Sequence, residues 1–305
     1  MIWNIDRISS QEQKIVIVTG ASSGIGLETT RLLAQHGATV IMAVRDIEKG
    51  EHMASSIRNQ QPDASLAVLR LELDSIASIK YFSNTFLDNF DQLDLLINNA
   101  GTSGSRTVKT QEGFELAMGV NHLGHFALTG CLLKSLMKTQ QSRVVTVSSG
   151  SHRGGTIELD SFHISPTDKY RASKLANILY ALELQRRFVS KGANIMSLAA
   201  HPGASKTEGV INMIHSQDSV FFRSILKLMA MFIMQPPSTG ALSILRAATD
   251  LQAQGGEYYG PGGFFGLRGH PQITLPSASA QDTDLAQQLW QRSIELTGID
   301  YEDLQ

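Results

Sequence analysis

Cysteine and clustered positive charge are both scarce in this chain of 305 residues. Its only cysteine, Cys131, excludes an intramolecular disulfide, and a chain without disulfides is typical of a reducing compartment. No tract is rich in Lys or Arg, and the net charge is −2. The composition therefore gives no support for a nucleic-acid partner or for attraction to an anionic membrane surface.

Long apolar segments are scarce as well. Met1–Lys14 is polar and charged, so it has no signal-peptide core and predicts a cytoplasmic protein. The apolar segment VFFRSILKLMAMFIM at Val220–Met234 includes Arg223 and Lys227, and it is shorter than the roughly 20 residues that span a membrane. Two interpretations stay open. The region 205–240 forms a substrate-binding helix or lid, or the apolar segment lies in a membrane surface and makes the protein membrane-associated.

What the sequence does contain is a regular alternation of strand-like and helix-like segments. The predicted strands are nearly continuous apolar runs at 14–20, 38–44, 65–71, 93–99, 143–149 and 193–200. The predicted helices lie at 25–36, from after the second strand to about 61, at 76–89, within 112–137 and at 168–190. Such runs are typical of parallel strands that helices cover on both faces. The pattern predicts an α/β fold, a Rossmann-type doubly wound parallel sheet, in one domain over residues 1–305.

A glycine-rich turn, TGASSGIG at Thr19–Gly26, joins the first strand to the first helix. Its glycines leave the backbone bare, so a pyrophosphate can approach the free N–H groups of the helix. A tight turn with glycines only for geometry is the alternative. The predicted nucleotide-binding residues of this turn are Gly20, Ser22, Ser23, Gly24, Ile25 and Gly26.

The segment KYRASK places Tyr170 and Lys174 four residues apart in a predicted helix. Residues with this spacing share one face, with Cβ atoms about 5–6 Å apart. A nearby ammonium stabilises a phenolate, so we expect the pKa of Tyr170 to fall below the usual value of about 10. The pair would then exchange a proton with a substrate, whereas a solvated helix face is the alternative.

The spacing Thr-Gly-x-x-x-Gly-x-Gly resembles that of the short-chain dehydrogenase/reductase family. More motifs follow in the family's order, over residues 19–207 in all: Asn98-Asn99-Ala100-Gly101, Asn121, Ser148-Ser149, Tyr170-x-x-x-Lys174 and Pro202-Gly203. The segment Gly150–Asp168 and the motif VNHLGHF are similar to those of retinol dehydrogenase-like proteins and related aldehyde reductases.

The resemblance implies a catalytic set of Asn121, Ser149, Tyr170 and Lys174. Ser149 would hold the substrate oxygen, and Tyr170 would exchange the proton. Lys174 would also reach the nicotinamide ribose. Asn121 would support a proton relay to the lysine, with a simple kink in the helix as the alternative. The remaining implied cofactor contacts are Glu72, Leu73, Asn99, Ala100, Gly101, Pro202, Gly203 and Thr207, although the family has Asp at the position of Glu72.

The choice between NADP and NAD depends on the residues after the second predicted strand. NAD enzymes usually have an acidic residue there, which accepts hydrogen bonds from the ribose hydroxyls. Here Val44 is followed by Arg45, whose guanidinium suits a 2′-phosphate. Asp46 comes next, and a shift in register would restore NAD. We expect NADP(H), with NAD(H) as the alternative.

The implied function is NADPH-dependent interconversion of a lipophilic aldehyde or ketone and its alcohol, with retinal as one candidate substrate. A homo-oligomer is typical of the family. Two alternatives stay open: a reductase that acts on a ring or C=C bond, and a non-catalytic NADP(H)-binding sensor or scaffold. His122 and His125 lack a nearby third ligand, so no metal site is expected. His201 is interpreted as structural.

Overall fold

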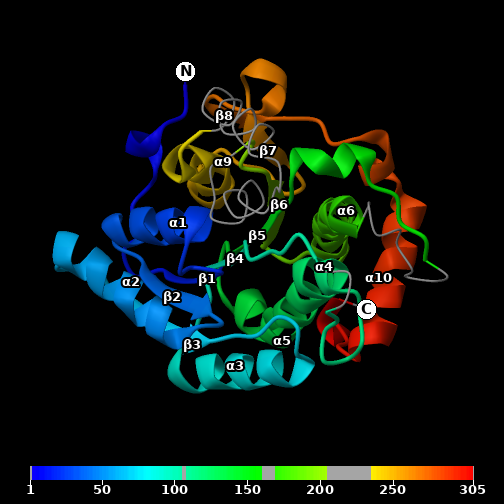
Figure 1. The fold of residues 1–305 in the computed structure, drawn as a ribbon, viewed down its shortest axis with the longest axis horizontal. Helices are drawn as coiled ribbons and strands as arrows, with labels where there is room; N and C mark the ends of the chain where they lie inside the picture. Colours follow the sequence, from blue (N-terminus) through cyan, green and yellow to red (C-terminus); the bar gives the residue numbers. More distant parts are fainter. Residues whose placement is uncertain (1, 105–107, 160–168, 205–234, 305) are drawn as a thin grey trace, which may run out of the picture.

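The structure, a computed structural model, describes residues 2–104, 108–159, 169–204 and 235–304. An eight-stranded sheet lies at its centre, with the strand order β3-β2-β1-β4-β5-β6-β7-β8 (Figure 1). The strands from β3 to β7 pair in parallel, and β8 pairs antiparallel with β7. The predicted α/β fold with a doubly wound parallel sheet is therefore confirmed, with two further strands that the sequence did not predict.

The elements follow the predicted alternation. The strands are β1 (Ile15–Thr19), β2 (Thr39–Val44), β3 (Leu66–Arg70), β4 (Leu95–Asn98), β5 (Arg143–Val147), β6 (Met196–Ala200), β7 (Tyr258–Pro261) and β8 (Pro271–Ile273). The α-helices are α1 (Gly24–Gln35), α2 (Ile47–Gln60), α3 (Ile76–Asn89), α4 (Leu116–Met118), α5 (Gly124–Lys138), α6 (Lys169–Ser190), α9 (Pro237–Thr249) and α10 (Thr283–Thr297). A π-helical turn, η2 (Gly119–Leu123), joins α4 to α5, and the short 3₁₀ helices are η1 (Ile5–Arg7), η3 (Gly150–Gly154), η4 (Phe264–Gly266), η5 (Ala278–Gln281) and η6 (Glu302–Leu304).

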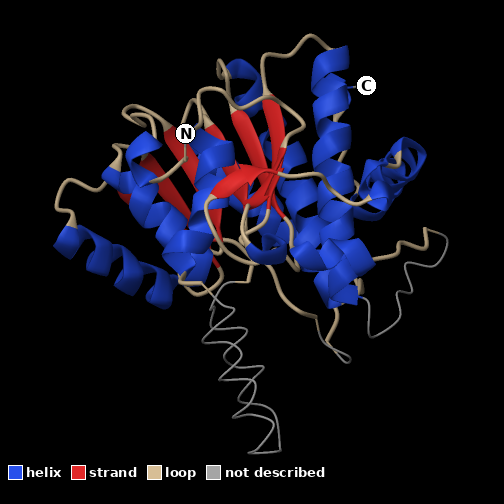
Figure 2. Ribbon diagram, turned by 90° about the horizontal axis from the view of Figure 1, so that it is seen from above, coloured by secondary structure: helices blue, strands red, loops and turns tan. Residues whose placement is uncertain are grey.

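Helices cover both faces of the sheet (Figure 2). Helices α1, α2 and α9 pack on one face, where buried side chains such as Val16, Val18 and Leu33 form one core. Helices α3, α5 and α6 pack on the other face, around Ile17 and Phe126. Successive residues of β1 thus enter opposite cores, which explains why the strand is apolar throughout. Helix α10 lies outside α6 and covers it (Figure 1).

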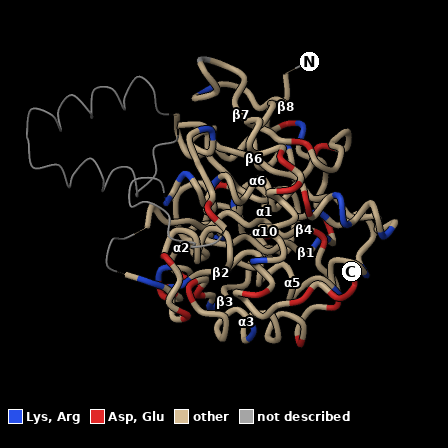
Figure 3. Tube along the Cα trace, turned by 90° about the vertical axis from the view of Figure 1, so that its right-hand side faces the viewer, with Lys and Arg blue, Asp and Glu red and all other residues tan. Residues whose placement is uncertain are grey.

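The continuous helix formed by α4, η2 and α5, Leu116–Lys138, is long and apolar enough to cross a membrane by length and composition. In this fold 78% of its apolar window is buried inside the protein, so the core accounts for its composition. The segment Val220–Met234, which the sequence left open between a lid and a membrane helix, lies outside the described residues. Basic and acidic residues are interspersed along the described chain (Figure 3).

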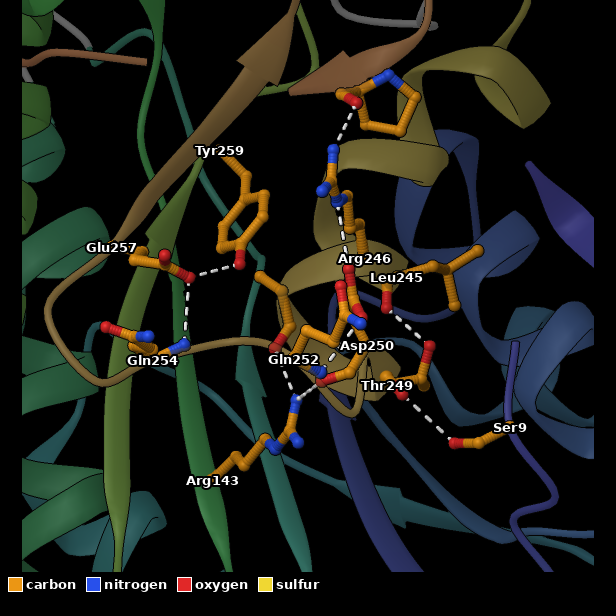
Figure 4. A network of polar contacts seen from close by, with 12 residues as sticks. Ser9, Arg143, Leu245, Arg246, Thr249, Asp250, Gln252, Gln254, Glu257 and Tyr259 are labelled. Atoms are coloured by element: carbon orange, nitrogen blue, oxygen red, sulfur yellow. Dashed lines mark hydrogen bonds and ion pairs between the residues drawn. The ribbon is translucent and has the colours of Figure 1, made fainter. Parts of the chain in front are cut away.

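Two arginines fix the unpredicted end of the sheet (Figure 4). Arg143 of β5 donates through Nη1 to the carbonyls of Ala247 and Asp250, at 3.1 and 3.0 Å, and so caps the end of α9. Arg246 of α9 pairs with the Asp250 carboxylate at 3.1 Å and donates to the Pro271 carbonyl of β8 at 2.8 Å. Burial lowers the pKa of Arg143. Strand β8 therefore depends on α9 as well as on its ladder with β7.

The substitution Arg143→Met is expected to lower the free energy of unfolding by about 1–3 kcal/mol, because it removes the guanidinium donor that the Ala247 and Asp250 carbonyls share at the end of α9. Urea unfolding measures the effect. Arg31→Met is the control, since Arg31 makes a partly exposed ion pair with Glu28 and a long, exposed hydrogen bond to Gln35 on α1, and its loss should change stability by less than about 0.5 kcal/mol. Equal losses in the two variants would contradict the capping role.

Candidate active site

The glycine turn after β1 has the shape that a pyrophosphate requires. Gly20 and Gly24 have left-handed backbones, with φ of +67° and +55°. A Cβ on Gly26 would lie 2.3 Å from the carbonyl oxygen of Gly20, so only glycine lets α1 pack this closely on the turn. Ser23 at the N-cap makes no side-chain capping hydrogen bond to the described backbone. The first N–H groups of α1 thus remain available for an anion.

The turn after β4 is tied to the end of β1 by Thr19, a contact that the sequence reasoning missed. The backbone N–H groups of Asn99 and Ala100 both donate to Thr19 Oγ1 at 2.9 Å. Asn99 Nδ2 donates to the Thr19 carbonyl at 2.8 Å. The initial threonine of the motif was the only available signal. These bonds bring the predicted residues Asn99 to Gly101 next to the glycine turn.

The end of β2 fixes the positions of Arg45 and Asp46. Strand β2 ends at Val44, and Arg45 follows it with an exposed side chain. The carboxylate of Asp46 accepts the backbone N–H of Lys49 at 3.0 Å and so caps α2. The carboxylate that could have favoured NAD is therefore engaged in a helix cap.

At the predicted adenine position, Glu72 follows β3, and its carboxylate pairs with Arg70 at 2.6 Å. Its neighbour Leu73 is buried, and the Leu73 carbonyl lies against Gly124, where a Cβ would approach it to 2.4 Å. Glu72 thus has a partner within the chain, and Leu73 packs at the start of α5.

The two serines at the end of β5 point in different directions, as strand alternation predicts. Ser148 is buried, and its Oγ donates to the Lys174 carbonyl at 2.7 Å, which ties β5 to α6. Ser149 lies at the N-cap of η3, where its Oγ accepts the Ser151 N–H at 3.2 Å and also makes a hydrogen bond with Tyr170. Ser149 therefore lies beside the predicted proton donor.

Tyr170 and Lys174 share one face of α6, as predicted. The Lys174 Nζ lies 5.8 Å from the centroid of the Tyr170 ring and donates to the Val147 carbonyl at 3.1 Å. Lys174 is only 4% exposed, and burial lowers its pKa to about 8. The expected fall in the pKa of Tyr170 is wrong for this state of the protein. Burial raises that pKa, and the hydrogen bond with Ser149 opposes the rise only in part.

Asn121 lies in the π-helical turn and connects three segments. Its Oδ1 accepts the Thr102 N–H at 2.7 Å, and its Nδ2 donates to the Thr102 carbonyl and to Ser173 Oγ, both at 2.9 Å. A Cβ on Gly101 would lie 3.2 Å from Asn121 Oδ1 and 3.3 Å from Lys174 Nζ. Asn121 thus lies where the helix is distorted and also beside the lysine, so the two interpretations of this residue are compatible.

The turn after β6 is held by residues that lie later in the sequence, Gln235 and Leu267. Gly203 has a φ of +68°, and a Cβ there would lie 2.4 Å from the Leu267 carbonyl. Gln235 Nε2 donates to the Pro202 carbonyl at 2.6 Å. His201 accepts the Gly203 N–H through Nδ1 at 3.3 Å, in agreement with a structural role. Thr207, the predicted carboxamide contact, lies outside the described residues.

His152 is a positioning residue that the sequence reasoning missed. Its Nδ1 lies 2.7 Å from the Ser149 carbonyl, and its Nε2 accepts the Ser277 N–H at 3.2 Å. The ring is 1% exposed. His152 therefore fastens the serine at the end of β5 to the segment before η5. No local pattern in GSHRGG indicated a contact with a residue so distant in sequence.

Comparison with known proteins agrees with this geometry. The sequence model of the short-chain dehydrogenase family matches residues 14–218. The chain belongs to this family. Human retinol dehydrogenase 11 is 38% identical over 294 residues, which cover 94% of this chain and 86% of that protein. Mouse polyprenol dehydrogenase is 35% identical over 298 residues, which cover 94% of this chain and 85% of that protein. These similarities place the chain in the retinol dehydrogenase-like branch.

Solved structures show the same fold. A crystal structure of a protein from Mycobacterium paratuberculosis has a TM-score of 0.79 and 37% identity, and the match covers 99% of each chain. A short-chain dehydrogenase from Shigella flexneri, determined in complex with NADP, has a TM-score of 0.65 and 23% identity, with 82% of this chain and 97% of that chain covered. The family assignment makes this chain an oxidoreductase that binds a nicotinamide cofactor.

The buried ammonium of Lys174 predicts a dependence of stability on pH. The pKa of Lys174 is about 8 in the folded protein against 10.5 for the free side chain. Between these values the unfolded chain binds more protons, so the lysine's contribution to folding becomes more favourable as the pH rises. The stability advantage of Lys174→Met over wild type should shrink by about 3 kcal/mol from pH 8 to pH 10.5.

Urea unfolding at a series of pH values measures this difference. Lys191→Met, at an exposed position just after α6, is the matched control and should follow the wild-type dependence on pH. A constant difference between Lys174→Met and wild type would show that the ammonium is not desolvated.

Proposed function

We propose that this protein uses NADPH to reduce a lipophilic aldehyde or ketone to its alcohol, in a reversible reaction, with retinal as one candidate substrate. The observation that carries the proposal is the convergence of Ser149, Tyr170 and Lys174 at the carboxyl end of β5, beside the glycine turn. Ligands of doubly wound folds bind at this edge of the sheet.

The chain offers contacts for the pyrophosphate, the nicotinamide ribose and the nicotinamide ring. The bare turn at Gly20 to Gly26 and the start of α1 suit the pyrophosphate. The turn at Asn99 to Gly101, together with Lys174, would hold the nicotinamide ribose, and Pro202 and Gly203 would back the ring. When bound, the nicotinamide supplies the hydride, and the residues of the chain supply orientation and the proton.

Tyr170 holds the proton that the carbonyl oxygen needs. Its raised pKa keeps the phenol protonated at neutral pH, and Ser149 would hold the same substrate oxygen by a second hydrogen bond. The ammonium of Lys174 would stabilise the phenolate that remains after the proton is transferred. Asn121 and Ser173 hold the start of α6, and with it Tyr170, in this orientation.

The proposed preference for NADP(H), which carries a 2′-phosphate, over NAD(H) depends on the residues that follow β2. Arg45 is exposed there, while the Asp46 carboxylate is engaged as the cap of α2. A guanidinium binds a 2′-phosphate through charge-assisted hydrogen bonds, and the capping bond directs the Asp46 carboxylate toward the start of α2. These contacts support NADP(H) over NAD(H).

The choice of a lipophilic substrate is supported by the relatives, which are named for retinol and polyprenol. Both compounds are long isoprenoid alcohols. On sequence grounds, we assign the apolar substrate contacts to the region 205–240 and add Phe162 as a candidate lining residue. Residues 160–168 and 205–234 lie outside the described part of the chain. A substrate of this kind also favours contact of the protein with a membrane surface.

Replacing Tyr170 by Phe is expected to lower kcat/KM for carbonyl reduction by about 10²–10⁴-fold, because the substrate oxygen loses its proton donor. NADPH oxidation is followed with short aldehydes, fatty aldehydes, retinal and steroid ketones. The control is Tyr81→Phe, on the surface of α3 with 72% exposure, which should retain wild-type activity. Wild-type activity in Tyr170→Phe would refute the mechanism. Binding of NADPH without reduction of any carbonyl would favour a sensor or a reductase of C=C bonds.

Replacing Arg45 by Ala is expected to weaken NADPH binding by about 10-fold or more, because charge-assisted hydrogen bonds to the 2′-phosphate are lost, and to leave NADH binding within about twofold. Isothermal titration calorimetry with each nucleotide measures both effects. Arg31→Ala is the control. It removes one positive charge from α1 and should change the affinity for neither nucleotide. Equal weakening of NADPH and NADH would show that Arg45 does not read the phosphate.

A further inference from the structure

Two buried histidines have different partners: His122 lies within the π-helical turn, and His125 lies just after it at the start of α5. His122 and His125 are each 1% exposed. The Nε2 of His122 lies 2.9 Å from Ser293 Oγ of α10, away from the glycine turn. His125 lies between two residues of the candidate site, with Nδ1 3.0 Å from the Asn121 carbonyl and Nε2 2.9 Å from Thr19 Oγ1.

The hydrogen-bond partners of His125 determine its protonation. A carbonyl can only accept, so Nδ1 carries the proton and donates it to Asn121. The opposite nitrogen, Nε2, then accepts from the Thr19 hydroxyl. That hydroxyl already accepts two backbone N–H groups, and its other acceptor, the Ile97 carbonyl, is more distant at 3.3 Å. Burial lowers the pKa of His125 to about 4, in agreement with a neutral ring.

One continuous series of hydrogen bonds joins the nucleotide-binding turns to α6, which carries Tyr170 and Lys174. On one side, Asn99 and Ala100 donate to Thr19, and Thr19 donates to His125. On the other side, His125 donates to the carbonyl of Asn121. Asn121 Nδ2 donates to Ser173 Oγ at 2.9 Å, and Ser173 Oγ donates to the Tyr170 carbonyl at 2.8 Å.

We propose that His125 is a positioning residue that couples the occupancy of the nucleotide site to the order of Asn121 and of the start of α6. The inference rests on the proposed function, because it takes NADPH as the ligand of the glycine turn. Binding there orders the turn around Thr19. The rigid imidazole transmits this order to Asn121 and, through Ser173, to the backbone of Tyr170.

Histidine suits this role because its two nitrogens lie on opposite sides of one planar ring. In His125→Asn, the amide nitrogen occupies the place of Nδ1, so the variant keeps the donor to Asn121 but falls short of Thr19. In His125→Gln, the longer amide reaches the place of Nε2, so the variant keeps an acceptor for Thr19 but loses the donor to Asn121. Each variant therefore removes a different hydrogen bond of the series: His125→Asn removes the bond with Thr19, and His125→Gln removes the bond to Asn121.

Hydrogen exchange followed by mass spectrometry tests the coupling without measuring turnover. Wild type, His125→Asn, His125→Gln and the control His122→Gln are compared with and without saturating NADPH. The control removes a buried histidine of the same helix whose partner is on α10. Peptides that cover 19–26, 119–125 and 169–177 report the nucleotide turn, the π-helical turn and the start of α6. NADPH affinity is measured in parallel by calorimetry.

In wild type and His122→Gln, NADPH is expected to slow exchange about 10-fold or more in all three peptides. In both His125 variants, NADPH is still expected to slow exchange in peptide 19–26. In peptide 169–177 it should slow exchange by less than about twofold. His125→Asn, which loses the bond to Thr19, should also bind NADPH about 10-fold more weakly, equivalent to about 1.4 kcal/mol.

Full protection of 169–177 in both His125 variants would overturn the coupling and leave the proposed function intact. The same loss of protection in His122→Gln would also overturn it, because any buried histidine would then serve. If wild type shows no protection at 19–26 with NADPH, the proposed nucleotide is wrong, and this coupling falls with it.

Discussion

The ammonium group of Lys174 lies between the end of β5 and the turn after β4, and the neighbouring residues are arranged around it. A charge that is 96% removed from solvent is costly unless it is hydrogen-bonded, and here the Val147 carbonyl accepts from it. Gly101 leaves the space that the ammonium and Asn121 occupy. Ser148 holds the carbonyl of the same lysine, so β5 and α6 are joined at the point where the charge is buried. Because Ser149 follows β5 and Tyr170 lies on α6, this joint also keeps Ser149 beside Tyr170.

Much of the fold could be predicted because the core of a parallel sheet leaves a strong pattern. The run Val16–Val18 is apolar on both faces, and that pattern identified β1 and the other internal strands. Strands β7 and β8 left no such pattern. They are four and three residues long, lie in a glycine-rich segment and begin or end with proline. They form because β6 offers an edge and Arg246 anchors Pro271, and these contacts cannot be seen in local sequence.

The candidate site was predictable where a motif places residues on one element. Tyr170 and Lys174 share a helix face because of their spacing, and the choice of Ser149 over Ser148 came from the resemblance to the family. The cap made by Asp46 is visible only in the folded chain, and the proposed preference for NADP(H) uses it. The roles of His125 and His152 depend on partners that are 106 and 125 residues away, so only the folded chain reveals them. The pKa of Tyr170 was predicted in the wrong direction because burial, which sequence does not show, outweighs the effect of the lysine.

Burial acts on the two titrating groups in opposite directions, and this bears on the direction of proton transfer. It raises the pKa of Tyr170 and lowers that of Lys174 to about 8, so the affinities of these groups for a proton are shifted apart in the sense that keeps the phenol protonated. A protonated phenol is the form that a carbonyl reduction requires, whereas oxidation of an alcohol requires the phenolate. Near neutral pH the lysine still carries its charge and can stabilise the phenolate once the proton has left. In the described state the phenol of Tyr170 therefore has the protonation that carbonyl reduction would use.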